Sequence, residues 1–251
     1  MQRILRARSA LVLLALAATL TLALALTAAD TRAAATSASA ITVRVEGTTK
    51  TLLRTTAVTL GSGKVVKDGK PADSCAGHSA AGALELATRG DWSGTWSASY
   101  KAYFLTSIEG LSFPSTGAEF WAFWVNDAPS ASGICGYDPK PGDSLLFFPD
   151  CYGKTCPKSA GVLGVKAPAV ATVGSPYTVS VTAYSDAKGT PSKAAGATVS
   201  AGGAGAKTAA SGKATLSFSH AGRFTLQVTK PNAVRTEASV CVQAAAAKTC
   251  A

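Results

Sequence analysis

The stretch FWAFWVNDAPSASGICGYDPKPGDSLLFFPD, residues 120–150, decides the fold of the first half of the chain. It opens with an aromatic segment, Phe120 to Asn126, whose composition is typical of a β-strand. A Pro-Gly-Asp turn then leads into a second apolar segment, Leu145 to Phe148, which also predicts a strand. Trp121 and Trp124, two of the four tryptophans, lie in the first of these strands.

Upstream, the sequence predicts an opening hairpin. Ile41, Val43 and Val45 alternate with polar residues, and a β-branched segment follows from Thr51 to Leu60. We expect residues 61–73, which are polar and rich in glycine, to form a loop.

A single helix follows this loop in the prediction. Ser79 is placed to cap it, apolar residues recur at helical spacing up to Ala87, and Gly90 suits a left-handed stop. Gly82 lies inside the helix and is expected to weaken it. Two strands, one helix and further strands, among them Tyr100–Ile108, indicate a small α+β domain over residues 41–150.

The second half of the chain, residues 161–243, predicts an all-β domain. Apolar residues alternate from Tyr177 to Thr182, and the pattern returns near Val199, Leu226 and Val240 with glycine turns between. Short strands at regular spacing favour a β-sandwich. The run GKATLSFSHAGRFTLQVTK, residues 212–230, resembles bacterial immunoglobulin-like domains of surface proteins. Residues 151–160 are interpreted as a hinge and residues 244–251 as a C-terminal tail.

The first 35 residues have the order of a secretory signal peptide. Three arginines precede an uncharged apolar run from Leu11 to Leu26, and a cluster of alanines ends at Ala35. We expect cleavage after Ala34 or Ala35, and the alternative is an uncleaved membrane anchor. Removal of this segment takes away four arginines and one aspartate, which leaves 20 basic and 13 acidic residues and a net charge of +7. The basic residues are scattered along the sequence, so we expect them mainly to keep the surface hydrated. Adhesion to anionic surfaces is the second interpretation.

The six cysteines of an exported chain are expected to form disulfides. Their order along the chain favours a bridge from the start of the helix to a loop of the same domain, a bridge across a short loop, and a bridge that holds the tail. These pairs are Cys75–Cys135, Cys151–Cys156 and Cys241–Cys250.

Several motifs of the first domain together resemble the transcobalamin C-terminal-like domain family. They are VRVEG (43–47), SAAGALELA (79–87), SIEG (107–110), FWAFWVND (120–127) and GYDPKPGDSLLFF (136–148). Members occur in bacterial exported proteins and in animal cobalamin carriers. The resemblance implies a β-grasp-like fold and a contribution to the enclosure of a ligand. The helical domain that encloses cobalamin in the animal carriers has no counterpart in this sequence.

The residues with chemical potential favour binding over catalysis. Cys75 and His78 have the spacing of half a metal site without a second pair, and no nucleophile–base motif is found. We therefore expect no catalytic residues, no metal and no cofactor. The alternating strand directs Trp121 and Phe123 to one face and Phe120 and Trp124 to the other.

With a helix on one side of the sheet only, one of those faces should be partly exposed and could form a ligand surface, but the sequence favours the alternative that both faces belong to the core. The surface is predicted around Trp121, Trp124, Asn126 and Tyr137, to which Trp92, Trp96, Tyr100 and Tyr103 could contribute.

The sequence thus predicts a non-enzymatic, exported binding or cell-surface interaction protein. It is expected to be secreted or extracytoplasmic and loosely associated with the cell surface. The candidate partners are a cell-wall polymer, another surface protein or a small apolar ligand, and nucleic acid is not expected. A small-ligand binding protein for a cobalamin-like corrinoid is the first alternative, and a hydrolase acting on wall polymers is the second.

Overall fold

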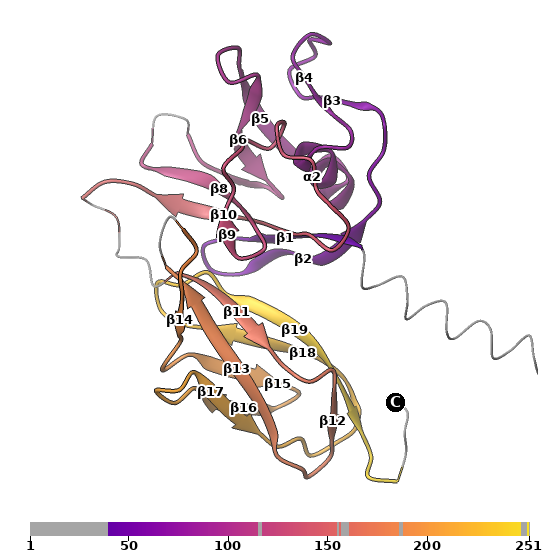
Figure 1. Ribbon diagram of the computed structural model, residues 1–251, viewed down its shortest axis with the longest axis vertical. Helices are drawn as coiled ribbons and strands as arrows, with labels where there is room; N and C mark the ends of the chain where they lie inside the picture. The colour runs from indigo at the N-terminus through magenta and orange to yellow at the C-terminus, as the bar shows by residue number, and fades with distance from the viewer. Residues whose placement is uncertain are drawn as a thin grey trace, which may run out of the picture. The chain divides into compact units, whose positions relative to one another are not determined.

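The chain is mostly β-structure with one described helix (Figure 1). The computed structural model describes residues 40–114, 117–154, 156, 161–185, 188–246 and 250. The predicted signal peptide and part of the predicted hinge lie outside the described residues. Residues 41–251 form one unit. Within the described part of the chain, no helix has the length and apolar character needed to cross a membrane.

The first part of the chain holds three sheets and the helix α2 (Ala80–Thr88). The largest of these sheets has five strands in the order β2-β1-β10-β8-β9. The second has three strands in the order β5-β6-β7, and the third is the pair β3-β4. The strands are β1 (Ile41–Glu46), β2 (Thr51–Val58), β3 (Lys64–Val66), β4 (Ser74–Ala76), β5 (Trp92–Ser97), β6 (Ala102–Ile108), β7 (Leu111–Ser112), β8 (Glu119–Val125), β9 (Ala128–Pro129) and β10 (Ser144–Cys151).

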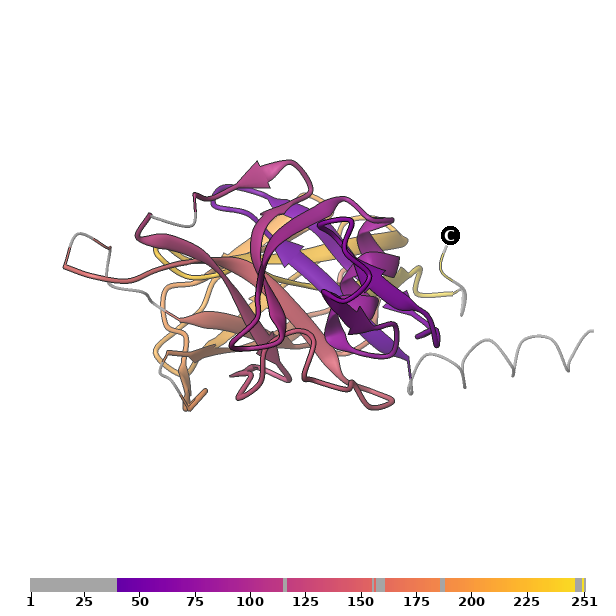
Figure 2. The same ribbon diagram turned by 90° about the horizontal axis from the view of Figure 1, so that it is seen from above.

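The five-stranded sheet is mixed because β1 and β10 run parallel at its centre while its other pairs are antiparallel. Val43 and Val45 of β1 and Leu145 and Phe147 of β10 have fully buried side chains in one cluster with Leu84 of α2. Figures 1 and 2 show α2 against β1 and β2. The helix therefore covers one face of the sheet, as the element order predicts.

The helix begins where its sequence predicts. The Ser79 hydroxyl accepts a hydrogen bond from the Gly82 N–H at 3.4 Å, so Ser79 is the N-cap. At the other end Arg89 adopts the left-handed conformation with φ 54°, followed by Gly90 with φ 84°. The left-handed turn that ends the helix thus begins at Arg89, one residue before the predicted Gly90.

Gly82 has a different role from the expected weakening. A Cβ at this position would lie 2.5 Å from the carbonyl carbon of Gly77 and 2.9 Å from its Cα. Only glycine permits α2 to approach the turn after β4 this closely.

The predicted loop at 61–73 was only partly correct. It contains β3, which pairs antiparallel with β4 just before the helix. The short strands β5, β7 and β9 were also not predicted, and β6 begins at Ala102 rather than Tyr100. Trp92–Ser97 contains glycine and serines and lacks the alternation on which the sequence prediction depends.

The second part of the chain consists of two sheets with a shared apolar core. One sheet contains β11-β13-β14, with β17 paired to β13, and the other has the order β12-β19-β18-β15-β16. The strands are β11 (Val162–Lys166), β12 (Val170–Thr172), β13 (Tyr177–Tyr184), β14 (Pro191–Lys193), β15 (Thr198–Ala201), β16 (Ala204–Lys207), β17 (Lys213–Leu216), β18 (Gly222–Thr229) and β19 (Thr236–Gln243). The alternating residues of β13 behave as predicted, because Tyr177, Val179 and Val181 are buried.

The polar face of β1 is buried as well as its apolar face. Glu46 is 2% exposed, and its carboxylate lies 2.5 Å from the Arg44 guanidinium and 3.1 Å from that of Arg235. Arg44 also donates to the Arg235 carbonyl at 2.7 Å. Burial raises the pKa of the Glu46 carboxyl, and the two arginines and Thr51 oppose that shift. This ion-pair network connects β1 to the segment before β19.

The cysteines form the three pairs that their order favours, Cys75–Cys135, Cys151–Cys156 and Cys241–Cys250. The first joins β4 to the segment after β9 and closes a ring with a sequence separation of 60. Three disulfides indicate an extracytoplasmic protein, because reducing compartments keep thiols free.

Candidate functional site

An open groove of about 870 Å³ lies beside β6 and β8. We call it the aromatic groove. Its described walls come from Tyr100 and residues 102–105, residues 120–124, the segment 129–134 from the end of β9, two residues of β10, and residues near the start of β11 and the end of β13. Aromatic side chains from all four strands β6, β8, β10 and β13 line it. A hollow of this size is within the usual range of ligand sites.

Three aromatic side chains of the groove are exposed. Tyr100 is 75% exposed and Phe104 is 55% exposed, and their rings meet edge to face with centroids 5.5 Å apart. Phe120, which is 40% exposed, lies on β8 with its ring centroid 6.1 Å from that of the exposed Tyr152. Large exposed rings close to one another commonly mark a contact surface.

Trp121 and Trp124 line the groove but are mostly buried, at 7% and 9% exposure. Trp121 packs edge to face on Phe113, with ring centroids 5.6 Å apart, in the same core cluster as the buried residues of α2. Trp124 belongs to a separate cluster on the opposite face of the sheet, with Phe148 and Val162. These two rings therefore belong to the core, which is the alternative that the sequence favours, although both also line the groove.

Asn126 and Tyr137 lie around Asp143, not in the groove. The Asn126 amide donates to one carboxylate oxygen of Asp143 at 2.7 Å, and the Tyr137 hydroxyl and the Lys140 N–H donate to the other, both at 2.8 Å. Burial opposes ionisation of Asp143, but these donors outweigh it and hold its pKa below the usual value. Burial and the neighbouring carboxylate raise the pKa of Tyr137 to about 12. Asp143 thus organises its turn, as expected, and Asn126 and Tyr137 serve the same turn.

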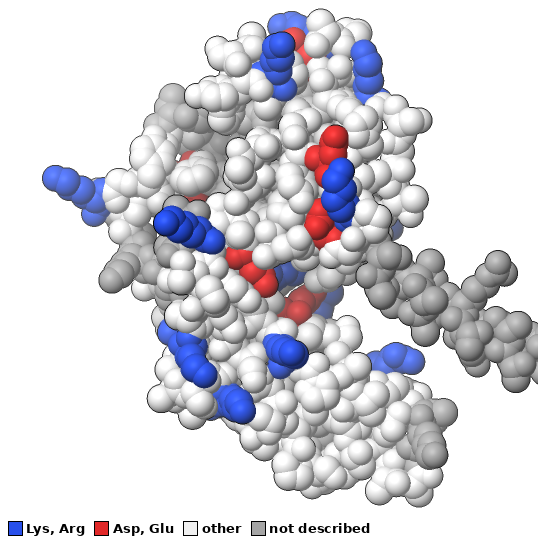
Figure 3. Space-filling model, viewed as in Figure 1, with Lys and Arg blue, Asp and Glu red and all other residues white. Residues whose placement is uncertain are grey.

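The groove has little charge. Asp150 is the one charged side chain among the described residues that line it, and one of its oxygens accepts the N–H of Cys151 at 2.8 Å. The remaining polar groups include the hydroxyls of Ser130, Ser132 and Ser185. Figure 3 shows Lys and Arg scattered over the visible face rather than gathered into one patch. The groove therefore offers ring faces, a few hydrogen bonds and one carboxylate.

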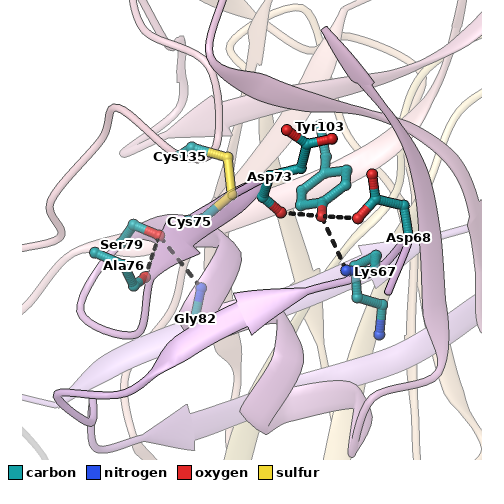
Figure 4. The surroundings of a disulfide bond; sticks show 9 residues. All are labelled: Lys67, Asp68, Asp73, Cys75, Ala76, Ser79, Gly82, Tyr103 and Cys135. Carbon is teal, nitrogen blue, oxygen red and sulfur yellow. Dashed lines mark hydrogen bonds between the residues drawn. A yellow bond between two sulfur atoms is a disulfide. The ribbon is translucent and has the colours of Figure 1, made fainter. Parts of the chain in front are cut away.

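Tyr103 connects the groove to the region of the first disulfide (Figure 4). The single proton of its hydroxyl lies within reach of two acceptors, the Asp68 carboxylate at 3.1 Å and the Asp73 carbonyl, and the hydroxyl oxygen accepts the Lys67 N–H at 3.0 Å. Burial raises the pKa of this hydroxyl, and the Asp68 carboxylate adds to that effect. The ring itself is buried and packs edge to face on Trp92 and Trp96. Of the four further aromatics considered in the sequence, Tyr100 and Tyr103 line the groove.

Cys75 and His78 do not form a metal centre. The Cys75 sulfur is bonded to Cys135, and the His78 ring lies 3.6 Å from the Asp138 carboxylate with both side chains exposed. No group of three or more potential metal-ligating residues (His, Cys, Asp or Glu) occurs among the described residues.

Phe104 is an exposed ring of the groove that the sequence did not predict as a site residue. Successive residues of Ala102–Leu105 are apolar or aromatic, so both faces of this strand carry apolar side chains. This lack of alternation in a strand outside the central sheet was the signal that could have identified an open apolar surface.

The comparisons with known proteins concern fold more than function. A family described as a domain of unknown function, DUF4430, matches residues 88–148, which include β5 to β9 and most of the groove. No curated protein matches the chain.

Three solved structures are similar to parts of the chain. A "putative metal binding protein" from Ruminococcus gnavus is 14% identical, with 46% of this chain and 99% of that chain covered and a TM-score of 0.32. The Arg-specific cysteine proteinase gingipain R is 19% identical, with 40% and 22% covered and a TM-score of 0.26. The D00-D0 domain of intimin is 17% identical, with 53% and 89% covered and a TM-score of 0.25. At these TM-scores the likenesses carry no functional conclusion.

Proposed function

We propose that this protein is an exported, non-enzymatic binding protein whose aromatic groove holds part of a larger partner at the cell surface. The observation that carries the proposal is the exposure of Tyr100, Phe104 and Phe120 on the walls of one groove. Burial of a large apolar side chain from full exposure contributes about 1.5–3 kcal/mol, and a partner that covers these rings would gain the part of it that corresponds to their exposed area. Several rings together can support useful affinity where one cannot.

The architecture is consistent with this role. We interpret residues 41–150 as a β-grasp-like domain related to the transcobalamin C-terminal-like family, because one helix packs on a mixed sheet with parallel central strands. We interpret residues 161–243 as an immunoglobulin-like sandwich that acts as a spacer or contact module. The DUF4430 match, residues 88–148, lies within the first of these domains.

A small apolar or corrinoid ligand is the second candidate. The volume of about 870 Å³ favours it, since small-molecule sites commonly enclose about 300–1,000 Å³. A larger partner is preferred because the exposed rings lie at the rim and would contact an extended molecule. A hydrolase acting on wall polymers is the remaining alternative, and turnover would identify it.

Tryptophan fluorescence tests the proposal, since Trp121 and Trp124 line the groove. The exported protein is titrated with a random peptide pool, soluble peptidoglycan fragments and cyanocobalamin. We expect a saturable change with one probe, weakened about tenfold or more in the double variant Phe104→Ala, Phe120→Ala.

Leu86→Ala is the matched control, because Leu86 is a large exposed apolar residue of α2 that does not line the groove. Binding that survives the double variant unchanged would place the site elsewhere. Cleavage of the peptidoglycan fragments would contradict a non-enzymatic role.

A further inference from the structure

β8 has an open edge in its first half. On one side it pairs with β10 from Glu119 to Val125. On the other side β9 pairs only with Trp124 and Val125, and a last backbone bond runs from the Ser130 N–H to the Phe123 carbonyl at 3.1 Å. The chain then leaves the sheet towards α2. In the described structure, residues 119–122 therefore have no strand on this side.

The backbone groups on that open side belong to Glu119 and Trp121. Successive residues of an antiparallel strand direct their N–H and C=O alternately to the two neighbours. Phe123 directs its carbonyl towards β9, so the residues two and four positions earlier point the same way. Pro149 of β10 lies opposite Trp121 of β8. Proline has no N–H, so it fits this position, where the two strands exchange no hydrogen bond. Two donors and two acceptors are thus presented on this edge.

The neighbouring strand β6 also has an open edge. β7 pairs only with Ser107 and Ile108, and one more bond joins the Phe113 N–H to the Thr106 carbonyl at 2.9 Å. Residues 102–105 have a described strand only on the β5 side. Residues 102–105 and 120–123 line the same groove. Open edges are commonly blunted by charged side chains, above all lysine, by proline or by a bulge; of residues 119–122 only Glu119 is charged, and none is a lysine, a proline or part of a bulge.

We propose that the aromatic groove binds an extended segment of another protein, which adds a strand beside residues 119–122 of β8. This inference rests on the proposed function and narrows the partner to a polypeptide. An extended peptide presents N–H and C=O pairs every second residue, roughly 7 Å apart, which is the repeat of Glu119 and Trp121. A glycan has no such backbone repeat. Four paired residues would span about 14 Å.

The charge of the groove narrows the partner further. Asp150 is the one charged side chain among the described lining residues, and Glu119 lies on the edge itself. A neutral or basic segment fits both carboxylates, whereas an acidic segment would oppose them. Alternate side chains of the added strand would face the rings of the groove, so apolar residues at every second position are expected.

Peptide selection followed by backbone methylation tests the inference. Random peptides displayed on phage are selected on the whole exported chain, and the strongest binder is synthesised with single N-methyl groups along its backbone. We expect methylation at every second position to weaken binding about tenfold or more and the intervening positions to tolerate it, since only alternate N–H groups would bond β8.

A matched pair of protein variants tests the same bond from the other side. Glu119→Pro removes an outward N–H without removing a bond to β10, and Glu119→Ala removes the same side chain but keeps the N–H. The proline variant is expected to bind the peptide about two- to tenfold more weakly than the alanine variant. Circular dichroism checks that both remain folded.

The outcomes separate this inference from the proposed function. Peptide binding that depends on Phe104 and Phe120 but not on backbone methylation would overturn strand addition and leave the groove as the site. If peptidoglycan fragments bind in the groove and no peptide is selected, strand addition would also be overturned and the groove would remain the site. Peptide binding that ignores both the rings and the β8 edge would overturn both proposals.

Discussion

Replacement of Gly82 by alanine sets helix propensity against packing in one residue. In an exposed helix, this change would stabilise the fold by about 1 kcal/mol, because glycine loses more backbone freedom on folding. In this protein the added methyl would meet the Gly77 backbone, 2.5 Å from its carbonyl carbon. No carbon–carbon contact is that short, so α2 or the turn must move.

Several hydrogen bonds oppose that movement. The turn is fixed by the Gly77 N–H, which donates to the Gly63 carbonyl at 2.6 Å, and the helix start by the N–H groups of Ala80 and Ala81, which donate to Tyr137 and Ile134. Overpacking a well-packed site costs about 1–3 kcal/mol, and a backbone contact lies at the upper end because it has no rotamer through which to relax. After the propensity gain, a net loss of about 2 kcal/mol is expected.

Urea unfolding of the oxidised, exported protein measures this change. We expect Gly82→Ala to lower the free energy of unfolding with an unchanged denaturant slope. Gly61→Ala is the matched control, because a Cβ there meets no atom within 4 Å, and its effect should stay within about 0.5 kcal/mol. An increase in stability by Gly82→Ala would refute the close-approach argument.

Three further predictions concern the disulfide, the ion-pair network and pH. Replacement of Cys75 and Cys135 by serine should lower the free energy of unfolding by about 4 kcal/mol, the chain-entropy value for a separation of 60, and an equally stable variant in urea unfolding would contradict it. Glu46→Ala should cost about 3–5 kcal/mol because the buried Arg44 and the partly buried Arg235 lose a buried partner. Glu46→Gln should cost less, and equal costs in thermal unfolding would argue against a charge effect. The pKa of Asp143 is lower in the folded protein than in the unfolded chain, so its contribution to the free energy of unfolding is complete above the unfolded pKa and is lost as pH falls through the folded pKa. In an Asp143→Asn variant, the free energy of unfolding should therefore fall less steeply with decreasing pH, and an unchanged pH dependence would refute this.

The parts of the fold that could be predicted from sequence depend on local signals. The cap at Ser79, the first hairpin and the alternation of β13 each arise from residues within a few positions of one another. The parallel pairing of β1 with β10 joins residues about a hundred positions apart, for example Val43 and Leu145. No local pattern records such a pairing, because its stability comes from the shared core under α2.

The second buried face of β1 shows the same limit for charge. Arg44 and Glu46 read as the solvent-facing half of an alternating strand, since isolated charges are rarely buried. Their burial depends on Arg235, which lies 189 positions after Glu46 and supplies the second guanidinium. A polar position in an alternating strand can therefore be interior when a distant segment completes its ion pairs.

The site shows why aromatic density alone does not identify a binding surface. Phe120–Asn126 marks a strand, but the exposure of its rings is decided by what covers each face. Trp121 packs in the main core with Phe113, and Trp124 packs with Phe148 and Val162, so the central rings of β8 became core. Phe120 at the end of the strand, and Phe104 on a strand outside the central sheet, kept their exposure because no described element covers them. If the groove binds a partner, these rim rings contribute the change in exposed area on binding, whereas the buried tryptophans hold the β8 backbone in position. Substitutions at Phe104 and Phe120 should thus weaken binding with little loss of stability, and substitutions at Trp121 should lower both.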